Sequence, residues 1–321
     1  MGRSATNQGE ETPPKSSCEW QRDRGFIAFF VCLVTLTLAF AVPLWRLVQH
    51  ALDEELHSHI VLIPFVSLYL AWLVRDKLPA CARPSYLPGA LLIVAAFTAF
   101  FLPLFTVGEL SENDDLSRWS ATYVLMTGAL GFLCLGRARM RLLAFPFFFL
   151  VFMIPLPDMA VQALEQWLMR ASATASHWLF QLTGTSVFRS GQSLQLPNIT
   201  LQVARECSGI RSTWVLLITS LIAAYLFLER KHHRMIVVAL VLPLGVVRNA
   251  LRIVVIGLLC VHIGPDMIDS WIHHRGGPVF FAISLIPLFL VALILRWIEA
   301  RSRKRKNRSD LDDRILQSSS L

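Results

Sequence analysis

Long apolar runs that alternate with short charged clusters constrain this chain more than any other feature of its sequence. A run of about 20 apolar residues can cross about 30 Å of hydrocarbon as a helix. Hydrophobic residues make up 55% of the 321 residues and charged residues only 16%, whereas a soluble domain carries about 25% charged residues. The sequence therefore predicts an all-α polytopic membrane protein, with no polar stretch long enough to fold as a soluble domain.

Eight apolar segments are candidate transmembrane helices, with boundaries good to a few residues. They are residues 26–48, 59–74, 87–107, 119–136, 141–157, 213–228, 235–262 and 278–297. The Pro-Leu-Gly step at 243–245 predicts a bend or break in the seventh segment. We expect a polar cytoplasmic N-terminus over 1–25, one membrane domain over 26–298 and a basic cytoplasmic tail over 299–321.

Lys and Arg residues in the short loops predict the orientation of the spans, because cytoplasmic loops carry an excess of positive charge. With the N-terminus inside, the basic loop residues that face the cytoplasm are Arg75, Lys77, Arg83, Arg137, Arg139, Arg141, Arg230, Lys231 and Arg234. An even number of spans places both termini in the cytoplasm, with the chain in a bacterial inner membrane. The excess of basic residues in cytoplasmic loops explains the net charge of +8. These residues also give the protein some affinity for anionic membrane lipid. Nucleic acid binding is not needed to explain the charge.

Residues 158–212 form a long extracytoplasmic segment between the fifth and sixth spans. Apolar residues recur on one helical face from Met159 to Leu182, which predicts an amphipathic helix in the outer membrane interface. Apolar residues on both sides of Pro197-Asn198 predict a short β-hairpin that leads to the sixth span. Functional residues are expected in such a segment.

Cys207 stands at the end of this segment, directly before Ser208-Gly209 and the sixth span. Unpaired N–H groups at a helix N-terminus lower the pKa of a thiol and favour the thiolate. A lone cysteine in a membrane protein is more often buried and inert, which is our interpretation of the other five. These are Cys18, Cys32, Cys81, Cys134 and Cys260. The spacing of the cysteines predicts no disulfide framework, no metal site and no cofactor.

Arg248 and Arg252 lie inside the seventh span, on either side of Asn249. An arginine at bilayer depth costs about 2.5–3.5 kcal/mol on insertion scales, so two in one span require an explanation. Because they are four residues apart, they share one helix face, which we expect to meet a polar cavity or a partner. A structural ion pair is the alternative, but no Asp or Glu lies within any predicted span.

His273, next to His274, precedes the eighth span and lies on the same predicted side as Cys207. An imidazole near a thiol can accept its proton or hold the thiolate as an ion pair. Other histidines on or near that side are His50, His57 and His59. Cys207, His273 and one intramembrane arginine would together provide what acyl transfer needs, although position alone does not select this histidine.

Four short elements, in this order along the chain, resemble the motifs of the exosortase/archaeosortase family. They are Ser-His-Ile at 58–60, Glu-Cys-Ser-Gly-Ile-Arg-Ser at 206–212, Asn-Ala-Leu-Arg-Ile at 249–253 and the His-x-x-x-Gly element at 273–277. The resemblance implies that the catalytic residues are Cys207, Arg252 and His273. It implies substrate-binding or supporting roles for Glu206, Ser208, Gly209, Arg211, Asn249, Arg248 and His59. One departure is that Glu206 adjoins Cys207, where many members have an intervening alanine.

The resemblance also implies a substrate, namely exported proteins with a C-terminal sorting signal made of a Pro-Glu-Pro-like motif, a transmembrane helix and a basic tail. In the implied reaction, the Cys207 thiolate attacks the scissile carbonyl at the outer membrane face, and an amine or water then takes the acyl group. His273 protonates the leaving amine, and Arg252 stabilises the oxyanion or orients the motif. Two alternatives are a transporter or channel with arginines that bind an anion, and an acyltransferase or assembly factor for exported polysaccharide.

Overall fold

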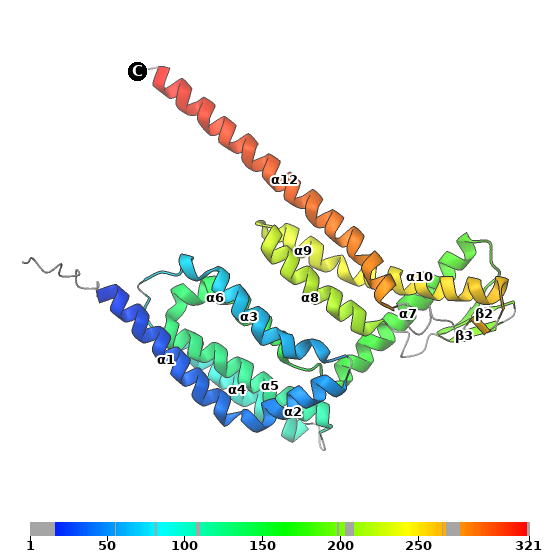
Figure 1. Ribbon diagram of the computed structural model, residues 1–321, viewed down its shortest axis with the longest axis horizontal. Coiled ribbons are helices and arrows are strands. Elements are labelled where there is room, and N and C mark those ends of the chain that lie inside the picture. The colour runs from blue at the N-terminus through cyan, green and yellow to red at the C-terminus, as the bar shows by residue number, and fades with distance from the viewer. Residues whose placement is uncertain are drawn as a thin grey trace, which may run out of the picture. The chain divides into compact units, whose positions relative to one another are not determined.

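Most of the chain is described by the computed structural model, which is shown in Figure 1. The described residues are 17–54, 56–80, 82–106, 110–197, 199–202, 209–264, 266–267 and 277–319. Side chains are described over the same ranges except at 17–23, 102–106, 306–307 and 309–319. The fold divides into two units, Met1–Asp158 and Met159–Leu321, each of which is described by itself.

The N-terminal unit consists of helices joined by short turns. Its elements are α1 (Ser17–Ala39), α2 (Ala41–Asp53), η1 (Ser58–Leu62), α3 (Ile63–Leu73), η2 (Arg75–Lys77), α4 (Tyr86–Thr106), α5 (Glu112–Leu130), η3 (Gly131–Leu135), α6 (Gly136–Phe149) and η4 (Leu150–Met153). The chain bends by 71° between α1 and α2. The predicted first span, 26–48, therefore falls on two helices with different directions.

The segment Glu112–Met153 folds back on itself at Gly136, which has a left-handed φ of 78°. A Cβ atom at Gly136 would lie 2.1 Å from the carbonyl oxygen of Arg83, so only glycine fits this turn. Ser117 Oγ donates to the carbonyl oxygen of Pro155 at 2.8 Å. A straight helix of 42 residues would separate its ends by about 63 Å. The contact between Ser117 and Pro155 therefore requires α5 and α6 to run antiparallel.

Membrane-spanning length is reached by fewer helices than the sequence predicts. Within the described residues, four helical segments are long and apolar enough to cross a membrane, or up to five if α1 and α2 form one bent span. The segment counted as Glu112–Met153 has two arms, before and after Gly136, which contain most of the predicted spans 119–136 and 141–157. The described apolar helices Ser58–Leu73 and Tyr86–Phe101 are shorter. The structure thus supports a multi-pass helical membrane protein, and the number of eight spans is not confirmed.

A histidine cluster lies between α2 and η1. The side chain of His57 is 7% exposed, and its ring centroid lies 5.0 Å from that of His50. Neither ring nitrogen of His57 has a hydrogen-bond partner within the described residues. The pKa of His57 is lowered from 6.5 to about 4, mainly by burial and also by the nearby His50 and His59, against the opposing charge of Asp158. His57 is therefore neutral at physiological pH.

The C-terminal unit combines helices with a small sheet. Its elements are α7 (Asp158–Leu182), β1 (Phe188–Ser190), β2 (Ser193–Leu196), β3 (Ile199–Gln202), α8 (Ile210–Phe227), α9 (Lys231–Ala239), α10 (Val241–His262) and α12 (Gly277–Ser319). The strands pair in the order β1-β2-β3, and both pairs are antiparallel. The predicted hairpin at Pro197 is confirmed as β2 and β3, and β1 is a third strand that the sequence did not indicate.

The inner face of the sheet packs on α7 and α10 and forms the core near the predicted site. Leu194, Leu196 and Leu201 are buried and alternate with exposed residues, as expected for a sheet with one covered face. They pack with Phe180 of α7 and Ile253 of α10. The sheet is thereby fixed against the helix that carries the two intramembrane arginines.

The predicted helix from Met159 to Leu182 is confirmed as α7, and residues of the apolar stripe, which was expected to face the membrane interface, lie outside the face that packs on the protein. Trp167, Trp178 and Leu182, which belong to that stripe, are exposed. The residues of α7 that face the protein are Leu168, Met169, Ser172, Ala173, Ser176 and Phe180. Small serine side chains let α7 approach α10 closely, and hydropathy alone does not count them as core residues.

The seventh predicted span lies in one candidate membrane span, Lys231–His262, with a single irregular residue at Leu240 between α9 and α10. Pro243 has no N–H group to donate to the carbonyl oxygen of Ala239, so the irregularity lies within one turn before the predicted step at 243–245. Gly245 then lies against α8, since a Cβ atom there would be 2.6 Å from Thr213 Oγ1. The glycine therefore serves close packing of the helices and does not break α10.

A buried carboxylate joins α12 to the corner between α8 and α9. Glu299 accepts hydrogen bonds from the backbone N–H groups of Glu229 and Arg230, each at 2.9 Å. It also lies 2.7 Å from Nδ1 of His233. The predicted basic tail continues α12 beyond this corner, as Figure 1 shows. The cytoplasmic end predicted for these helices is thus held by polar contacts.

Gly257→Ala should destabilise the C-terminal unit. A Cβ atom at this position would lie 2.5 Å from Cζ of Phe180 and 3.0 Å from Cδ1 of Leu201, both buried. Overpacking of this kind costs about 1–3 kcal/mol, so thermal unfolding in detergent should show a lower Tm. Gly128→Ala is the matched control, because its Cβ atom would meet only the tip of Leu92 at 3.3 Å. Equal Tm values for the two variants would contradict the packing of the sheet on α10.

Acidification should destabilise the N-terminal unit through His57. Between pH 6.5 and about 4 the unfolded chain binds a proton at this side chain and the folded chain does not, so stability falls as the pH falls and no loss occurs above pH 6.5. The full loss is about 3 kcal/mol, at 1.36 kcal/mol per unit of pKa. His57→Met should flatten the dependence of Tm on pH between 4 and 7. A slope unchanged by this substitution would exclude His57 as its source.

Candidate functional site

The residues predicted to carry the function fall into three groups in the structure. Glu206, Cys207, Ser208 and His273 lie outside the described residues. His59 belongs to the N-terminal unit. The remaining predicted site residues belong to the C-terminal unit and are Gly209, Arg211, Arg248, Asn249 and Arg252. The structure brings Gly209, Arg248 and Asn249 into direct contact.

Gly209 is the N-cap residue of α8 and has a φ of 70° and a ψ of 12°, a left-handed conformation that favours glycine. Its carbonyl oxygen accepts the first hydrogen bond of the helix from the N–H of Thr213 at 3.0 Å. A Cβ atom at Gly209 would lie 3.2 Å from Nη2 of Arg248 and 3.3 Å from Cγ of Asn249. Both the backbone conformation and the close approach of α10 therefore require glycine directly after Cys207-Ser208.

Arg248 is only 6% exposed and lies against the start of α8. Its Nη2 donates to the carbonyl oxygen of Gly209 at 3.2 Å and to Oγ1 of Thr213 at 3.3 Å. Its Nη1 is buried and has no hydrogen-bond partner within the described residues. The guanidinium thus faces protein, as the cost of an arginine in lipid requires, and one of its donors remains unsatisfied.

Asn249 joins α10 to α7. Its side chain is 3% exposed, and Nδ2 donates to Oγ of Ser172 at 3.0 Å. One turn further along α7, Oγ of Ser176 lies 3.5 Å from the carbonyl oxygen of Ala250. Because α10 contacts α7 through Asn249 and α8 through Arg248, these two neighbouring residues set the arrangement of three helices.

Arg252 lies one turn after Arg248 on the same face of α10 and is half-buried. The two guanidinium groups interact electrostatically, and like charges at this spacing repel each other. Arg248 forms no ion pair with an acidic residue of the described chain. Within the described residues, Arg248 therefore does not form the structural ion pair that was the alternative explanation for intramembrane arginines.

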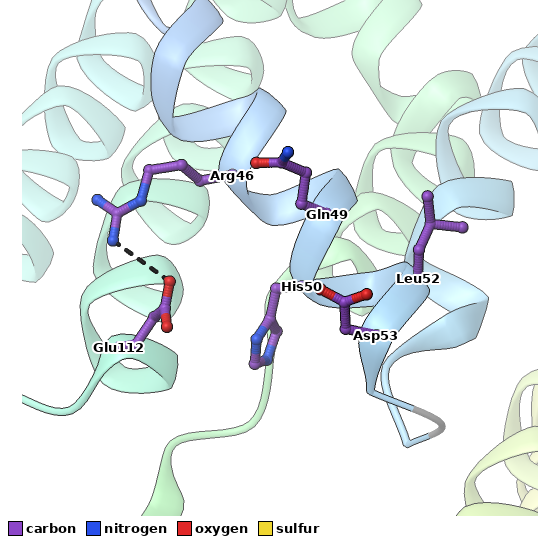
Figure 2. A pocket seen from close by; sticks show the side chains of 6 residues that line it. All are labelled: Arg46, Gln49, His50, Leu52, Asp53 and Glu112. Carbon is purple, nitrogen blue, oxygen red and sulfur yellow. Dashed lines mark ion pairs between the residues drawn. The ribbon is translucent and has the colours of Figure 1, made fainter.

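His59 belongs to the histidine cluster of the N-terminal unit, where its Nδ1 lies 3.1 Å from the carbonyl oxygen of Leu56. This unit also contains a polar pocket of about 440 Å³, which Figure 2 shows between α2 and the start of α5. Residues that line it are Arg46, Gln49, His50, Leu52, Asp53 and Glu112. Sequence analysis did not identify Arg46 or Gln49, because polar residues are ordinary at the end of an apolar run.

The pocket is crossed by ion pairs that link α2 to α5. Arg46 Nη2 lies 3.6 Å from Glu112 Oε1, and Arg46 Nη1 lies 3.5 Å from Asp115 Oδ2. None of the residues around the pocket belongs to the predicted catalytic set. Within the described residues, no group of His, Cys, Asp and Glu side chains has an arrangement that could hold a metal ion. The described residues that bear on the predicted acyl-transfer chemistry are therefore those around Gly209.

Around Gly209, a cation and a helix N-terminus lie together. Helix N-termini favour negative charge, and a fixed guanidinium in a site with little water stabilises an anionic oxygen strongly. Gly209 follows a cysteine by two residues, so this positive environment adjoins the predicted nucleophile in the sequence. The arrangement can bind an anion or stabilise the oxyanion of an acyl-transfer reaction.

Comparison with known proteins assigns the chain to a family. The family model described as transmembrane exosortase (Exosortase_EpsH) matches residues 45–290. This range is more than half of the chain and includes Gly209 and both arginines of α10. Searches of curated proteins and of solved structures found no match. The chain therefore belongs to the transmembrane exosortase family.

Proposed function

We propose that this exosortase is a membrane-embedded cysteine peptidase or transpeptidase. It cleaves the C-terminal sorting signal of exported proteins at the outer face of the bacterial inner membrane. Family membership supports an exosortase that acts on such signals. The observation that carries the proposal further is the contact of Gly209 with Arg248 and Asn249, directly after Cys207-Ser208.

Chain connectivity supports a thiol in this environment. Two residues span at most about 7 Å, so Cys207 cannot be far from Gly209 and the N-terminus of α8. On the other side of residues 203–208, Leu201 of β3 packs against Gly257 of α10. A nearby helix N-terminus and a guanidinium both favour the thiolate over the thiol. A cysteine in such surroundings would be reactive, in contrast to Cys260, which is 1% exposed.

In the proposed reaction, the Cys207 thiolate attacks the scissile carbonyl carbon and forms a tetrahedral oxyanion. Collapse of this intermediate breaks the C–N bond and leaves the exported protein as a thioester on Cys207. His273 gives a proton to the leaving amine, which departs with the sorting signal, and Arg252 stabilises the oxyanion or orients the signal. An amine acceptor or water then attacks the thioester and restores the thiolate.

The proposed topology has eight spans within one membrane domain over 26–298, with both termini in the cytoplasm. The basic residues on α12, such as Arg301 and Arg303, would then lie at the inner face. The sheet and the start of α8 would lie at the outer face. A substrate helix held by its own basic tail would present its sorting motif on that side, where the proposal places Cys207.

An anion transporter or channel is the second candidate function, because Arg248 is buried in a membrane protein without an acidic partner in the described chain. In that case the arginines of α10 would bind a permeating anion, and Cys207 would be dispensable. Substitution of Cys207 therefore distinguishes the two candidates, because it should abolish peptidase activity and leave anion transport unchanged.

Cys207→Ala and Cys207→Ser should each lower processing of a tailed substrate by more than about 1000-fold, since loss of a nucleophile removes the covalent pathway. Processing is scored by gel shift in cells that co-express the substrate, with expression of each variant checked. Cys260→Ala is the matched control and should remain active, because the Cys260 thiol is buried in the core. Processing by Cys207→Ala of a substrate that the wild type cleaves would refute the cysteine mechanism.

A further inference from the structure

The unsatisfied donor of Arg248 is the starting point for a binding site. Nη2 has two acceptors, whereas Nη1 is buried without one in the described chain. A buried donor without a partner is destabilising, and more so when it is charged. Arginine stays charged at neutral pH, so the cost cannot be relieved by loss of a proton. The unpaired Nη1 donor of Arg248 therefore suggests that a ligand binds there.

No acidic side chain of the described residues forms an ion pair with Arg248. Arg252 adds a second guanidinium one turn further along the same face. Two buried or paired acids of the same unit are engaged elsewhere: Glu299 binds the corner at His233, and Glu229 pairs with Arg303. An anion would therefore gain energy from both guanidinium groups.

The position of Arg248 adds a second source of positive potential. Its guanidinium touches Gly209 at the N-terminus of α8, a helix of 18 residues. The N-terminus of such a helix carries about half a positive charge and is a common anion site. Because Gly209 has no side chain, nothing from this residue separates the guanidinium from the helix end.

We propose that Nη1 of Arg248 binds an anionic oxygen of the substrate at the N-terminus of α8. This oxygen belongs either to a carboxylate of the sorting segment or to the tetrahedral intermediate at the scissile carbonyl. The proposal rests on the proposed function and assigns Arg248 a binding role that is separate from that of Arg252. Thr213 and the carbonyl of Gly209 are positioning groups, because they hold Nη2 and thereby orient Nη1.

The test uses the full-length protein in lipid nanodiscs and a purified tailed substrate. Arg248→Gln should lower kcat/KM by about 100- to 1000-fold, the usual effect of losing one donor to an oxyanion, and Arg248→Lys should restore part of the activity. Arg303→Gln removes an exposed arginine on α12 and is the matched control. Thermal unfolding separates binding from folding: Arg248→Gln should keep the wild-type Tm or raise it, because it removes a buried unpaired charge.

A second substrate, in which amides replace the acidic residues ahead of the transmembrane helix, identifies the source of the oxygen. If it is a carboxylate, the amide substrate should have a higher KM with the wild type and cause no further loss with Arg248→Gln. If it is the tetrahedral oxyanion, Arg248→Gln should lower kcat equally on both substrates.

Wild-type kcat and KM in Arg248→Gln would overturn the inference, as would a loss of activity that merely follows a lower Tm. The Cys207→Ala variant is measured on the same substrate. Processing by Cys207→Ala would refute the proposed function. An inactive Cys207→Ala beside a fully active Arg248→Gln would refute the Arg248 inference alone.

Discussion

A seam of polar contacts along α10 links three helices of the C-terminal unit. Asn249 donates to Ser172 of α7, and Arg248 donates to Gly209 and Thr213 at the start of α8. In an apolar medium no water competes for these groups, so polar contacts between helices favour one register over its neighbours. Apolar packing alone gives weaker discrimination, because lipid tails are as apolar as the side chains that they would replace.

The same seam links the fold to the proposed chemistry. Leu201 packs against Gly257, and Gly209 packs against Arg248, so both flanks of residues 203–208 are attached to one helix. The two described flanks of the interval that contains the proposed nucleophile thus rest on one rigid element, which helps to fix a reacting geometry. Binding of a negatively charged group would then offset the free-energy cost of placing an arginine inside the membrane.

Sequence periodicity predicted the elements whose signal is local. The helix α7, the β2–β3 hairpin and the start of α8 follow from apolar spacing, Pro197-Asn198 and Gly209. The fold-back at Gly136 agrees with the reversal expected between the predicted spans 119–136 and 141–157, and the irregular residue Leu240 lies within one turn of the predicted Pro-Leu-Gly step. Features that depend on distant contacts could not be predicted: the tight turn at Gly136 also needs the carbonyl of Arg83, and the buried face of α7 depends on serines that meet α10.

The candidate site was predictable in part. Arg248 and Arg252 stood out because charge inside an apolar run is costly. Their unequal surroundings, with Arg248 buried against α8 and Arg252 half-buried, appear only in three dimensions. The pocket lined by Arg46 and Glu112 was not predicted, since its residues come from separate helices and none is unusual alone.

Mass spectrometry of the enzyme during turnover tests the central claim most directly. Wild-type protein mixed with a tailed substrate and quenched in acid should carry the exported part of that substrate as a thioester on Cys207, and hydroxylamine should release it. A substrate that is processed while Cys207 remains unmodified, or while Cys207 is blocked by an alkylating reagent, would contradict the cysteine mechanism.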